Sequence, residues 1–183
     1  MRYLYLIIAF VLFSCNACQE PEARKPVSVK SGSTYSKSAE RTKKLLEKEN
    51  QLIDNYIKID SLNSYKQSQH GFSYAYIKQD TTTNVTPFFG NKVVFKYHIT
   101  DLNNNPIYTE EELGIQSYRV DQQNIMNGLR KGLKLMRVNE TIKCVFPSQI
   151  AYGYKGDRNK IKPNTPIVCT ITLNEILTLN EKK

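Results

Sequence analysis

The sequence predicts an α+β fold, in which an antiparallel β-sheet wraps around one helix and a helical lead-in precedes the sheet. Runs of β-forming residues separated by turn residues fill the second half of the chain. A single helical pattern interrupts them at Asn124–Met136, and a longer one covers roughly Ser38–Asp60. The 183 residues, 40% of them apolar, are enough for one domain with a core and an extension.

The strands are expected from Gly71 onwards. Aromatic and small residues alternate at Phe72–Tyr76, Val93–Thr100 is rich in β-formers, and the turn cluster Asp101–Pro106 follows it. Further strands are expected at residues 107–108, 117–120, 141–146 and 167–177. The change of pattern at Gly71 separates the helical first part of the chain from a part rich in strands.

An amphipathic helical lead-in is expected at residues 38–68. Its apolar residues recur at helical spacing, with lysine and glutamate on the other face. These apolar residues are Leu45, Leu46, Leu52, Ile53, Tyr56 and Ile57. The stripe can pack on its own domain, which we favour, or pair with another copy or a partner.

The N-terminus has the features of a bacterial lipoprotein signal peptide at residues 1–14. A positive start precedes the apolar run Tyr3–Phe13, which is too short to span a bilayer comfortably. Leu12–Cys15 resembles a lipobox, so Cys15 is the expected lipidation site, with residues 15–37 as a flexible tether. Cys18 is a rival acceptor, and a plain secretory signal or an uncleaved helix are the alternatives. The predicted location is the bacterial cell envelope, anchored to a membrane and facing the periplasm.

Charge and metal-ligating residues argue against several functions. The formal net charge of +9 permits contact with anionic lipid, but no arginine-rich stripe with interleaved aromatics supports a nucleic-acid partner. The four cysteines are Cys15, Cys18, Cys144 and Cys169, and the two histidines are His70 and His98. Their spacing forms neither a zinc site nor a catalytic triad, so no metal or other cofactor is expected. Cys144 and Cys169 lie in apolar runs and are interpreted as buried small hydrophobic residues.

Two segments of the second half carry a family resemblance. The first is Asn124–Met136, and the second is Phe146–Thr165, which contains Ala151-Tyr152-Gly153. Together with Val94–Tyr97, their order and spacing resemble the FKBP-type peptidyl-prolyl cis-trans isomerase domain over residues 71–178. With the lipobox and the tether, the whole chain resembles the gliding-motility-associated FKBP-type lipoproteins of Bacteroidetes.

This resemblance implies rotamase activity on Xaa–Pro bonds of exported proteins, without a cofactor. The Tyr152 hydroxyl is expected to donate to the carbonyl before the proline, and the Met126 backbone N–H to hold the peptide beyond it. Tyr97 is the third expected catalytic residue. The implied substrate-binding residues are Tyr97, Ile107, Tyr108, Ile125, Met126, Leu129, Tyr152 and Ile161.

The chain departs from the family pattern at several positions. Ile107-Tyr108 stands where the family usually has Phe-Asp, and Leu129 stands where a tryptophan forms the floor of the pocket. Other family aromatics fall at Gln116 and Cys169. Three functions therefore stay open. The first is an isomerase that assists protein folding, the second is a weak or inactive binding or chaperone module of an envelope complex, and the third is electrostatic docking to anionic lipid or polymer.

Overall fold

The computed structural model describes residues 32–178. Ala39–Lys183 form one compact unit, and Met1–Ser38 belong to another. The predicted signal peptide, Cys15, its rival Cys18 and the tether up to residue 31 lie outside the described residues and remain predictions. In the described part of the chain, no helix is both long enough and apolar enough to cross a membrane.

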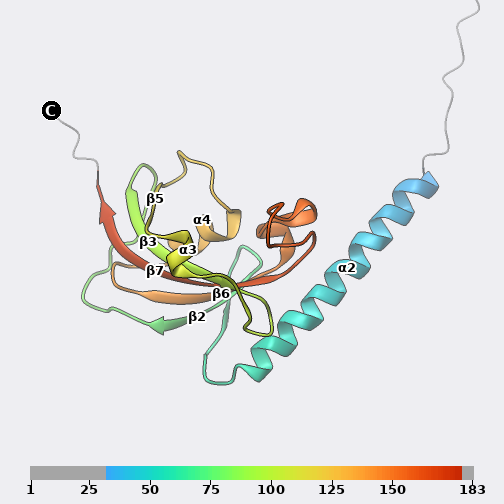
Figure 1. The fold of residues 1–183 in the computed structure, drawn as a ribbon, viewed down its shortest axis with the longest axis horizontal. Coiled ribbons are helices and arrows are strands. Elements are labelled where there is room, and N and C mark those ends of the chain that lie inside the picture. The colour runs from blue at the N-terminus through green and yellow to red at the C-terminus, as the bar shows by residue number, and fades with distance from the viewer. Residues whose placement is uncertain (1–31, 179–183) are drawn as a thin grey trace, which may run out of the picture. The chain divides into compact units, whose positions relative to one another are not determined.

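Within residues 32–178, seven antiparallel strands form one sheet (Figure 1). Its order is β1-β2-β6-β7-β3-β4, and β5 also pairs with β3. The strands are β1 (Lys66–Gln67), β2 (Ser73–Lys78), β3 (Lys92–Thr100), β4 (Pro106–Tyr108), β5 (Gln116–Arg119), β6 (Thr141–Phe146) and β7 (Ile167–Leu177). The predicted α+β class and the strands expected from the sequence are confirmed, and β1 is an addition.

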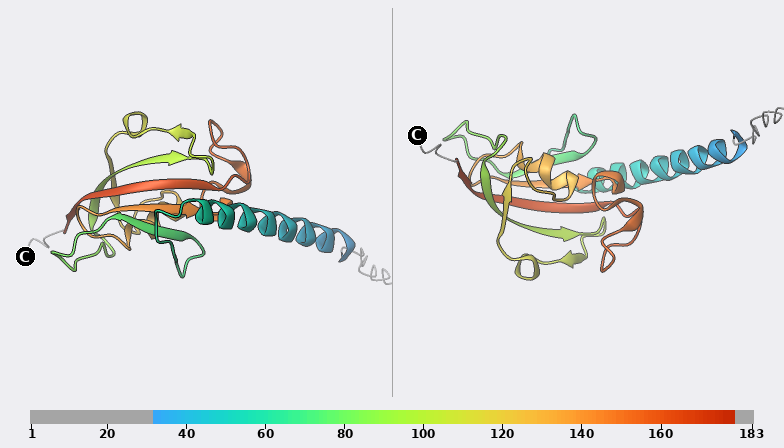
Figure 2. Two further views of the ribbon diagram at one scale, coloured as in Figure 1. Left: turned by 90° about the horizontal axis from the view of Figure 1, so that it is seen from below. Right: turned by 90° about the horizontal axis from the view of Figure 1, so that it is seen from above.

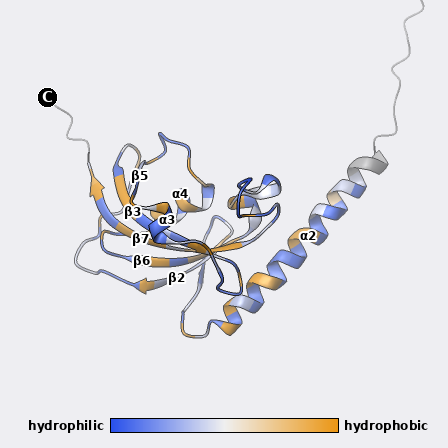
Figure 3. Ribbon diagram, in the orientation of Figure 1, coloured by the Kyte–Doolittle hydropathy of each residue, from blue (hydrophilic) through white to orange (hydrophobic). Residues whose placement is uncertain are grey.

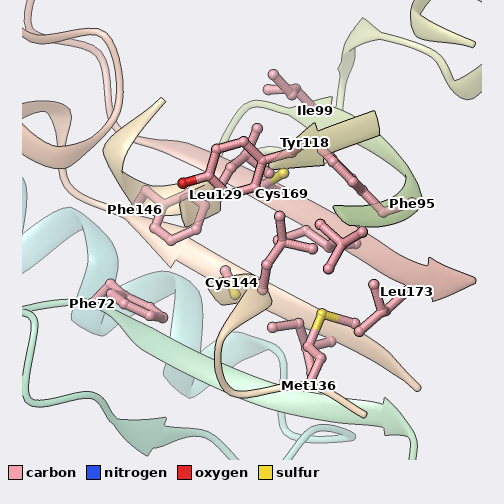
Figure 4. Close-up of a cluster of buried hydrophobic side chains, with 14 of the residues drawn as sticks. Phe72, Phe95, Ile99, Tyr118, Leu129, Met136, Cys144, Phe146, Cys169 and Leu173 are labelled. Atoms are coloured by element: carbon pink, nitrogen blue, oxygen red, sulfur yellow. The ribbon is translucent and has the colours of Figure 1, made fainter. Parts of the chain in front are cut away.

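Helix α4 (Asn127–Leu133) lies on one face of the sheet, over β6 and β7. Its two glycines permit close packing on the strands. A Cβ atom at Gly128 would lie 2.9 Å from the Phe146 ring, and one at Gly132 would lie 3.2 Å from Ile171. The main apolar core fills this interface, as Figure 4 shows, and it includes the free thiols of Cys144 and Cys169. Both cysteines are completely buried, in agreement with their interpretation as small hydrophobic residues.

Helix α2 (Gly32–Ile59) packs through its last turns on the face of the sheet opposite α4, to which alternate residues of β6 and β7 point. Its Ile53 and Tyr56 pack against Val145 of β6 and Val168 of β7. Figure 3 shows that its apolar residues are interspersed among hydrophilic ones, as expected of an amphipathic helix. The contacts support the interpretation that the lead-in packs on its own domain.

The bounds of two helices differ from those expected. Helix α2 starts at Gly32 instead of Ser38, so residues 32–37 of the predicted tether are helical. Helix α4 covers only Asn127–Leu133 instead of Asn124–Met136. The helix begins later because the backbone at Met126 is extended, with φ −49° and ψ 131°. It ends earlier because the chain tightens into a turn, in which the Met136 N–H donates to the Leu133 carbonyl.

A further short helix, α3 (Glu110–Leu113), follows β4 and was not expected. The Thr109 side chain accepts from the Glu112 N–H, and the Glu112 carboxylate accepts from the Thr109 N–H. This reciprocal pair is a capping box, whose Thr-x-x-Glu pattern is visible in the sequence. Figure 2 shows α3 and β5 in the connection between β4 and α4.

Candidate active site

A cavity of about 570 Å³ opens on the α4 side of the sheet. Its walls come from four places: the middle of β3, the start of β5, the segment leading into α4, and the loop after β6. The lining residues are Phe95, Tyr97, Gln116, Ser117, Asn124, Ile125, Met126, Asn127, Leu129, Ala151 and Tyr152. A mixture of rings, aliphatic side chains and a few polar groups is typical of small-ligand sites.

Five of the eight predicted site residues meet around this cavity. They are Tyr97, Ile125, Met126, Leu129 and Tyr152. The other three lie outside its lining: Ile161 is buried in the core, while Ile107 and Tyr108 pack against the core from β4. The structure therefore joins the two motif segments that are widely separated in the sequence.

Sequence reasoning did not predict the other six lining residues, which are Phe95, Gln116, Ser117, Asn124, Asn127 and Ala151. For Phe95 a signal existed, because it stands two residues before Tyr97 in β3 and must point to the same face of the sheet. The Phe95 and Tyr97 rings lie 5.7 Å apart, which makes them one continuous aromatic wall. Ala151 has no comparable signal, because its place depends on how the loop after β6 folds.

The segment before α4 presents an unused backbone donor to the cavity. Met126 is extended, and its carbonyl accepts the first helical hydrogen bond from Arg130. Among residues 32–178, no group accepts a hydrogen bond from the Met126 N–H. The late start of α4 thus leaves a donor available for a peptide carbonyl.

Tyr97 and Tyr152 bring two half-buried phenols to the cavity. Burial, with a smaller contribution from nearby Cys169 and Tyr108, raises the pKa of Tyr97 to about 12. Burial, followed by the neighbouring Tyr97, also raises the pKa of Tyr152. Within the described part of the chain neither hydroxyl has a hydrogen-bond partner. Both phenols therefore stay protonated at neutral pH, and each can donate a hydrogen bond to a ligand.

The site holds no evident metal-ligating cluster. Residues 32–178 contain no group of three or more His, Cys, Asp or Glu side chains that could hold a metal ion. The cavity offers apolar contact, hydrogen-bond donation by two phenols and one backbone N–H, and the polar side chains of Gln116, Ser117, Asn124 and Asn127.

A family model for FKBP-type peptidyl-prolyl cis-trans isomerases matches residues 83–174, half of the chain. The chain belongs to this family. Peptidyl-prolyl cis-trans isomerisation is accordingly its activity, and proline-containing peptides are its substrates.

Solved structures share this fold. A peptidyl-prolyl cis-trans isomerase from Pseudomonas syringae pv. tomato is 21% identical with a TM-score of 0.60, and the match covers 75% of this chain and 96% of that one. FkpA from Escherichia coli is also 21% identical, with a TM-score of 0.59 over 94% of this chain and 81% of that one. No curated protein sequence matches the chain significantly.

The departures from the FKBP pattern have structural consequences in the cavity. Leu129, 3% exposed, stands at the floor position where the family usually has tryptophan. A leucine is smaller than an indole and offers no ring face, so the floor is deeper and less rigid. Gln116 lines the wall, and its side-chain amide donates to the Leu113 carbonyl at the end of α3.

Tyr108, at the family's usual aspartate position, is bound to the loop that follows Tyr152. Its hydroxyl donates to Asp157 Oδ2 at 2.5 Å and accepts from Asn159 Nδ2 at 3.1 Å. The hydrogen bond to Asp157 raises the pKa of Tyr108. Burial opposes the ionisation of Asp157, but hydrogen bonds from Tyr108 and from backbone N–H groups lower its pKa overall. The carboxylate missing from β4 is therefore replaced nearby by a phenol with an ionised carboxylate behind it.

The Asp157 carboxylate also shapes this loop. Its Oδ1 accepts from the backbone N–H groups of Asn159 and Ile161, each at 2.8 Å. Gly156 makes the tight return possible, because a Cβ atom there would lie 2.2 Å from the Ile161 carbonyl oxygen and its φ is +64°. Neither Asp157 nor Gly156 was singled out by sequence reasoning for this role.

Proposed function

We propose that this chain is a membrane-tethered FKBP-type isomerase that assists the folding of exported proteins by accelerating Xaa–Pro isomerisation. The observation that carries the proposal is the cavity in which apolar side chains surround two free donors, the Tyr152 hydroxyl and the Met126 N–H. A proline ring needs apolar side chains around it, and the carbonyl groups on either side of the ring need hydrogen-bond donors.

The chemistry follows from the barrier of the reaction. Amide resonance makes rotation about an Xaa–Pro bond cost about 18–20 kcal/mol, and resonance weakens when the amide leaves water. Ile125 and Leu129 would hold the pyrrolidine ring against the Tyr97 side of the cavity. The Tyr152 hydroxyl would donate to the carbonyl before the proline, and the Met126 N–H would hold the peptide beyond it. Interactions that strengthen in the twisted state lower the barrier, and no covalent intermediate is needed.

The proposed location rests on the N-terminal sequence. Lipidation of Cys15 would tether the domain to a membrane of the bacterial cell envelope, most simply on the periplasmic side. The tether predicted from the sequence would link Cys15 to the domain. The resemblance of the whole chain to gliding-motility-associated FKBP-type lipoproteins supports a role in that process.

The test is NMR exchange spectroscopy of small Xaa–Pro peptides with the full chain in detergent micelles. Catalysis is expected, and Tyr152→Phe is expected to lower kcat/KM roughly tenfold, because one hydrogen bond worth about 1–3 kcal/mol in the twisted state is lost. Tyr154→Phe is the matched control, because Tyr154 is an exposed phenol two residues away. Unchanged peptide exchange in the presence of the wild type would overturn the proposal.

A second candidate is a proline-recognition or chaperone module of an envelope complex with little turnover. It is favoured by the Tyr108–Asp157 hydrogen bond, which occupies the phenol that replaces the family's aspartate, and by the Leu129 floor. Peptide chemical-shift changes without accelerated exchange would support this candidate. Restored acceleration in Leu129→Trp would then identify the floor as the cause.

A further inference from the structure

The charged residues of α2 are mostly exposed, but Glu49 is 3% exposed. Its carboxylate faces Ser148, which follows β6 and is 2% exposed. The Ser148 hydroxyl donates to Glu49 Oε1 at 2.7 Å, and the Ser148 N–H donates to Oε2 at 3.1 Å. A buried carboxylate is destabilising unless such donors satisfy it, so this contact has a fixed geometry.

A short path of backbone hydrogen bonds connects Ser148 to the cavity. Ser148 begins the 3₁₀ helix Ser148–Ile150, and its carbonyl accepts from the Ala151 N–H at 3.1 Å. Ala151 and Tyr152 are the next residues, and both line the cavity. The position of Ser148 therefore controls where the chain enters the segment that carries the Tyr152 hydroxyl.

Attachment of α2 to the sheet does not require this carboxylate. Ile53 and Tyr56 already pack on Val145 and Val168, and Asp60 forms an ion pair with Lys143 of β6 at 2.8 Å. Glu49 stands one turn before Ile53, where an apolar residue would extend the packed stripe. A carboxylate at this position adds no apolar area. It adds a directional contact instead, because it accepts from two donors of fixed position.

Apolar contact between α2 and the loop is also limited here. A groove of about 490 Å³ separates Leu45 and Leu46 of α2 from Gly153 and Tyr154 of the loop. The Glu49–Ser148 contact at the edge of this groove is therefore the specific link between the helix and the segment that leads to Tyr152.

We infer that Glu49 is a positioning residue of the isomerase, which acts through Ser148 to hold Ala151 and Tyr152 at the cavity. The inference rests on the proposed function, because it assumes that Tyr152 binds the substrate. It makes α2 part of the catalytic unit, although the cavity lining includes no residue of this helix.

The experiment compares four variants of the full chain in detergent micelles: Glu49→Gln, Glu49→Leu, Ser148→Ala and the double variant Glu49→Gln/Ser148→Ala. Exchange spectroscopy gives kcat/KM, and ¹H–¹⁵N spectra give the amide shifts of Ala151, Tyr152 and Gly153. Glu47→Gln is the matched control, because Glu47 is an exposed glutamate on the same helix. Unfolding is followed for every variant.

We expect Glu49→Leu to lower kcat/KM about tenfold, because leucine accepts from neither donor of Ser148. Glu49→Gln should lower it less, because its carbonyl can accept from the Ser148 N–H while its amide donates to the Ser148 hydroxyl oxygen. Ser148→Ala is expected to lower it by a similar factor, and the double variant no further, since both act through one contact. Glu49→Leu keeps α2 docked through apolar packing and is still expected to lose activity. The amides of Ala151 and Tyr152 should shift in all four variants and stay in place in Glu47→Gln.

The two hypotheses fail in different ways. A wild type that leaves peptide exchange unchanged overturns the proposed function, and the amide shifts then report on the positioning contact by themselves. If the wild type is active but Glu49→Gln and Glu49→Leu keep kcat/KM within about twofold and leave the three amides unmoved, the positioning role is overturned. Loss of activity only in proportion to unfolded protein also overturns it, because Glu49 would then merely attach the helix.

Discussion

The two faces of the sheet are covered by helices in different ways. The α4 face buries a continuous apolar core of fully enclosed side chains and carries the cavity at its edge. On the α2 face, the buried cluster of the described residues is small and consists of Ile53, Tyr56, Val145 and Val168. Polar contacts supplement it there, including the Asp60–Lys143 ion pair and a hydrogen bond from the Tyr56 hydroxyl to Asn104.

This difference means that the α4 face stabilises the fold of the domain, whereas the α2 face serves to attach one helix to it. Apolar burial is non-directional and scales with area, so the α4 face supplies most of the stabilisation of the domain. Hydrogen bonds and ion pairs contribute less net stability, but they specify position. Helix α2 is therefore held in one register with modest free energy, and its attachment depends on charge.

The largest effect is expected from truncating the core on the α4 face. Leu133→Ala removes a fully buried side chain and should lower the free energy of unfolding by about 2–5 kcal/mol, which urea denaturation measures. Ile53→Ala on the α2 face should cost about 1–2 kcal/mol, because Ile53 is 6% exposed and the helix can relax away from the sheet. Equal losses in the two variants would contradict the distinction between the faces.

The glycines of α4 sharpen the comparison within its own face. Gly128→Ala places a methyl group 2.9 Å from the buried Phe146 ring and should destabilise the domain by about 1–3 kcal/mol through overpacking. Gly132→Ala should cost less, because its Cβ would lie 3.2 Å from the Cδ1 end of the Ile171 side chain and not against a ring. The gain in helix propensity of about 1 kcal/mol is common to both sites and offsets more of this smaller strain. Thermal unfolding of the pair checks the order, and a milder effect at Gly128 would show that Phe146 can move aside.

Removing the Asp60 carboxylate should have a smaller effect on stability, and this effect should be confined to the attachment of α2. The Asp60 carboxylate accepts from Lys143 at 2.8 Å and from the Tyr65 hydroxyl at 2.7 Å. Asp60→Asn should cost about 1 kcal/mol and speed hydrogen exchange in α2 more than in β7. Asp54→Asn is the control, because Asp54 is an exposed carboxylate on α2, six positions before Asp60. Uniform faster exchange across the domain would mean that both faces unfold together.

Acid should weaken the attachment of α2 to the sheet, and this is the smallest of the expected effects on stability. Burial opposes the ionisation of Asp60, but hydrogen bonds from Lys143, Tyr65 and Asn63 lower its pKa below the ordinary 3.8. A lowered folded-state pKa contributes stability that is present above about pH 3.8 and is lost as the pH falls through the folded value. Unfolding measured from pH 6 to pH 2 should show a shallower loss in Asp60→Asn than in the wild type. Superimposable pH profiles would show that Asp60 does not contribute.

Much of the fold was predictable because it follows from local patterns. The β-forming runs of β3 and β7, the turn after Thr100 and the amphipathic spacing of α2 each depend on residues close in sequence. The capping box of α3 was equally readable but was missed. The shortened α4 was not readable, because an apolar helical pattern does not show that Ile125 and Met126 lie outside the helix and that the Met126 N–H is free.

The candidate site divides in the same way. Motif order was enough to select Tyr97, Leu129 and Tyr152, since side chains in such motifs keep their place relative to the strand or helix that carries them. The pairing of Tyr108 with Asp157, 49 positions apart, has no local signal. This hydrogen bond forms only when the loop after Tyr152 folds back against β4, and that path is set by tertiary packing.

By itself, the sequence determined the α+β class, the family motifs and the chemical character of the cavity, because these depend on residue type and on spacing along the chain. Only the tertiary structure decided that Glu49 meets Ser148, 99 positions away, and that Asp157 stands behind Tyr108. Such contacts join elements that are distant in sequence, and a hydrogen bond forms only when packing brings donor and acceptor to about 3 Å. No pattern along the chain encodes that distance.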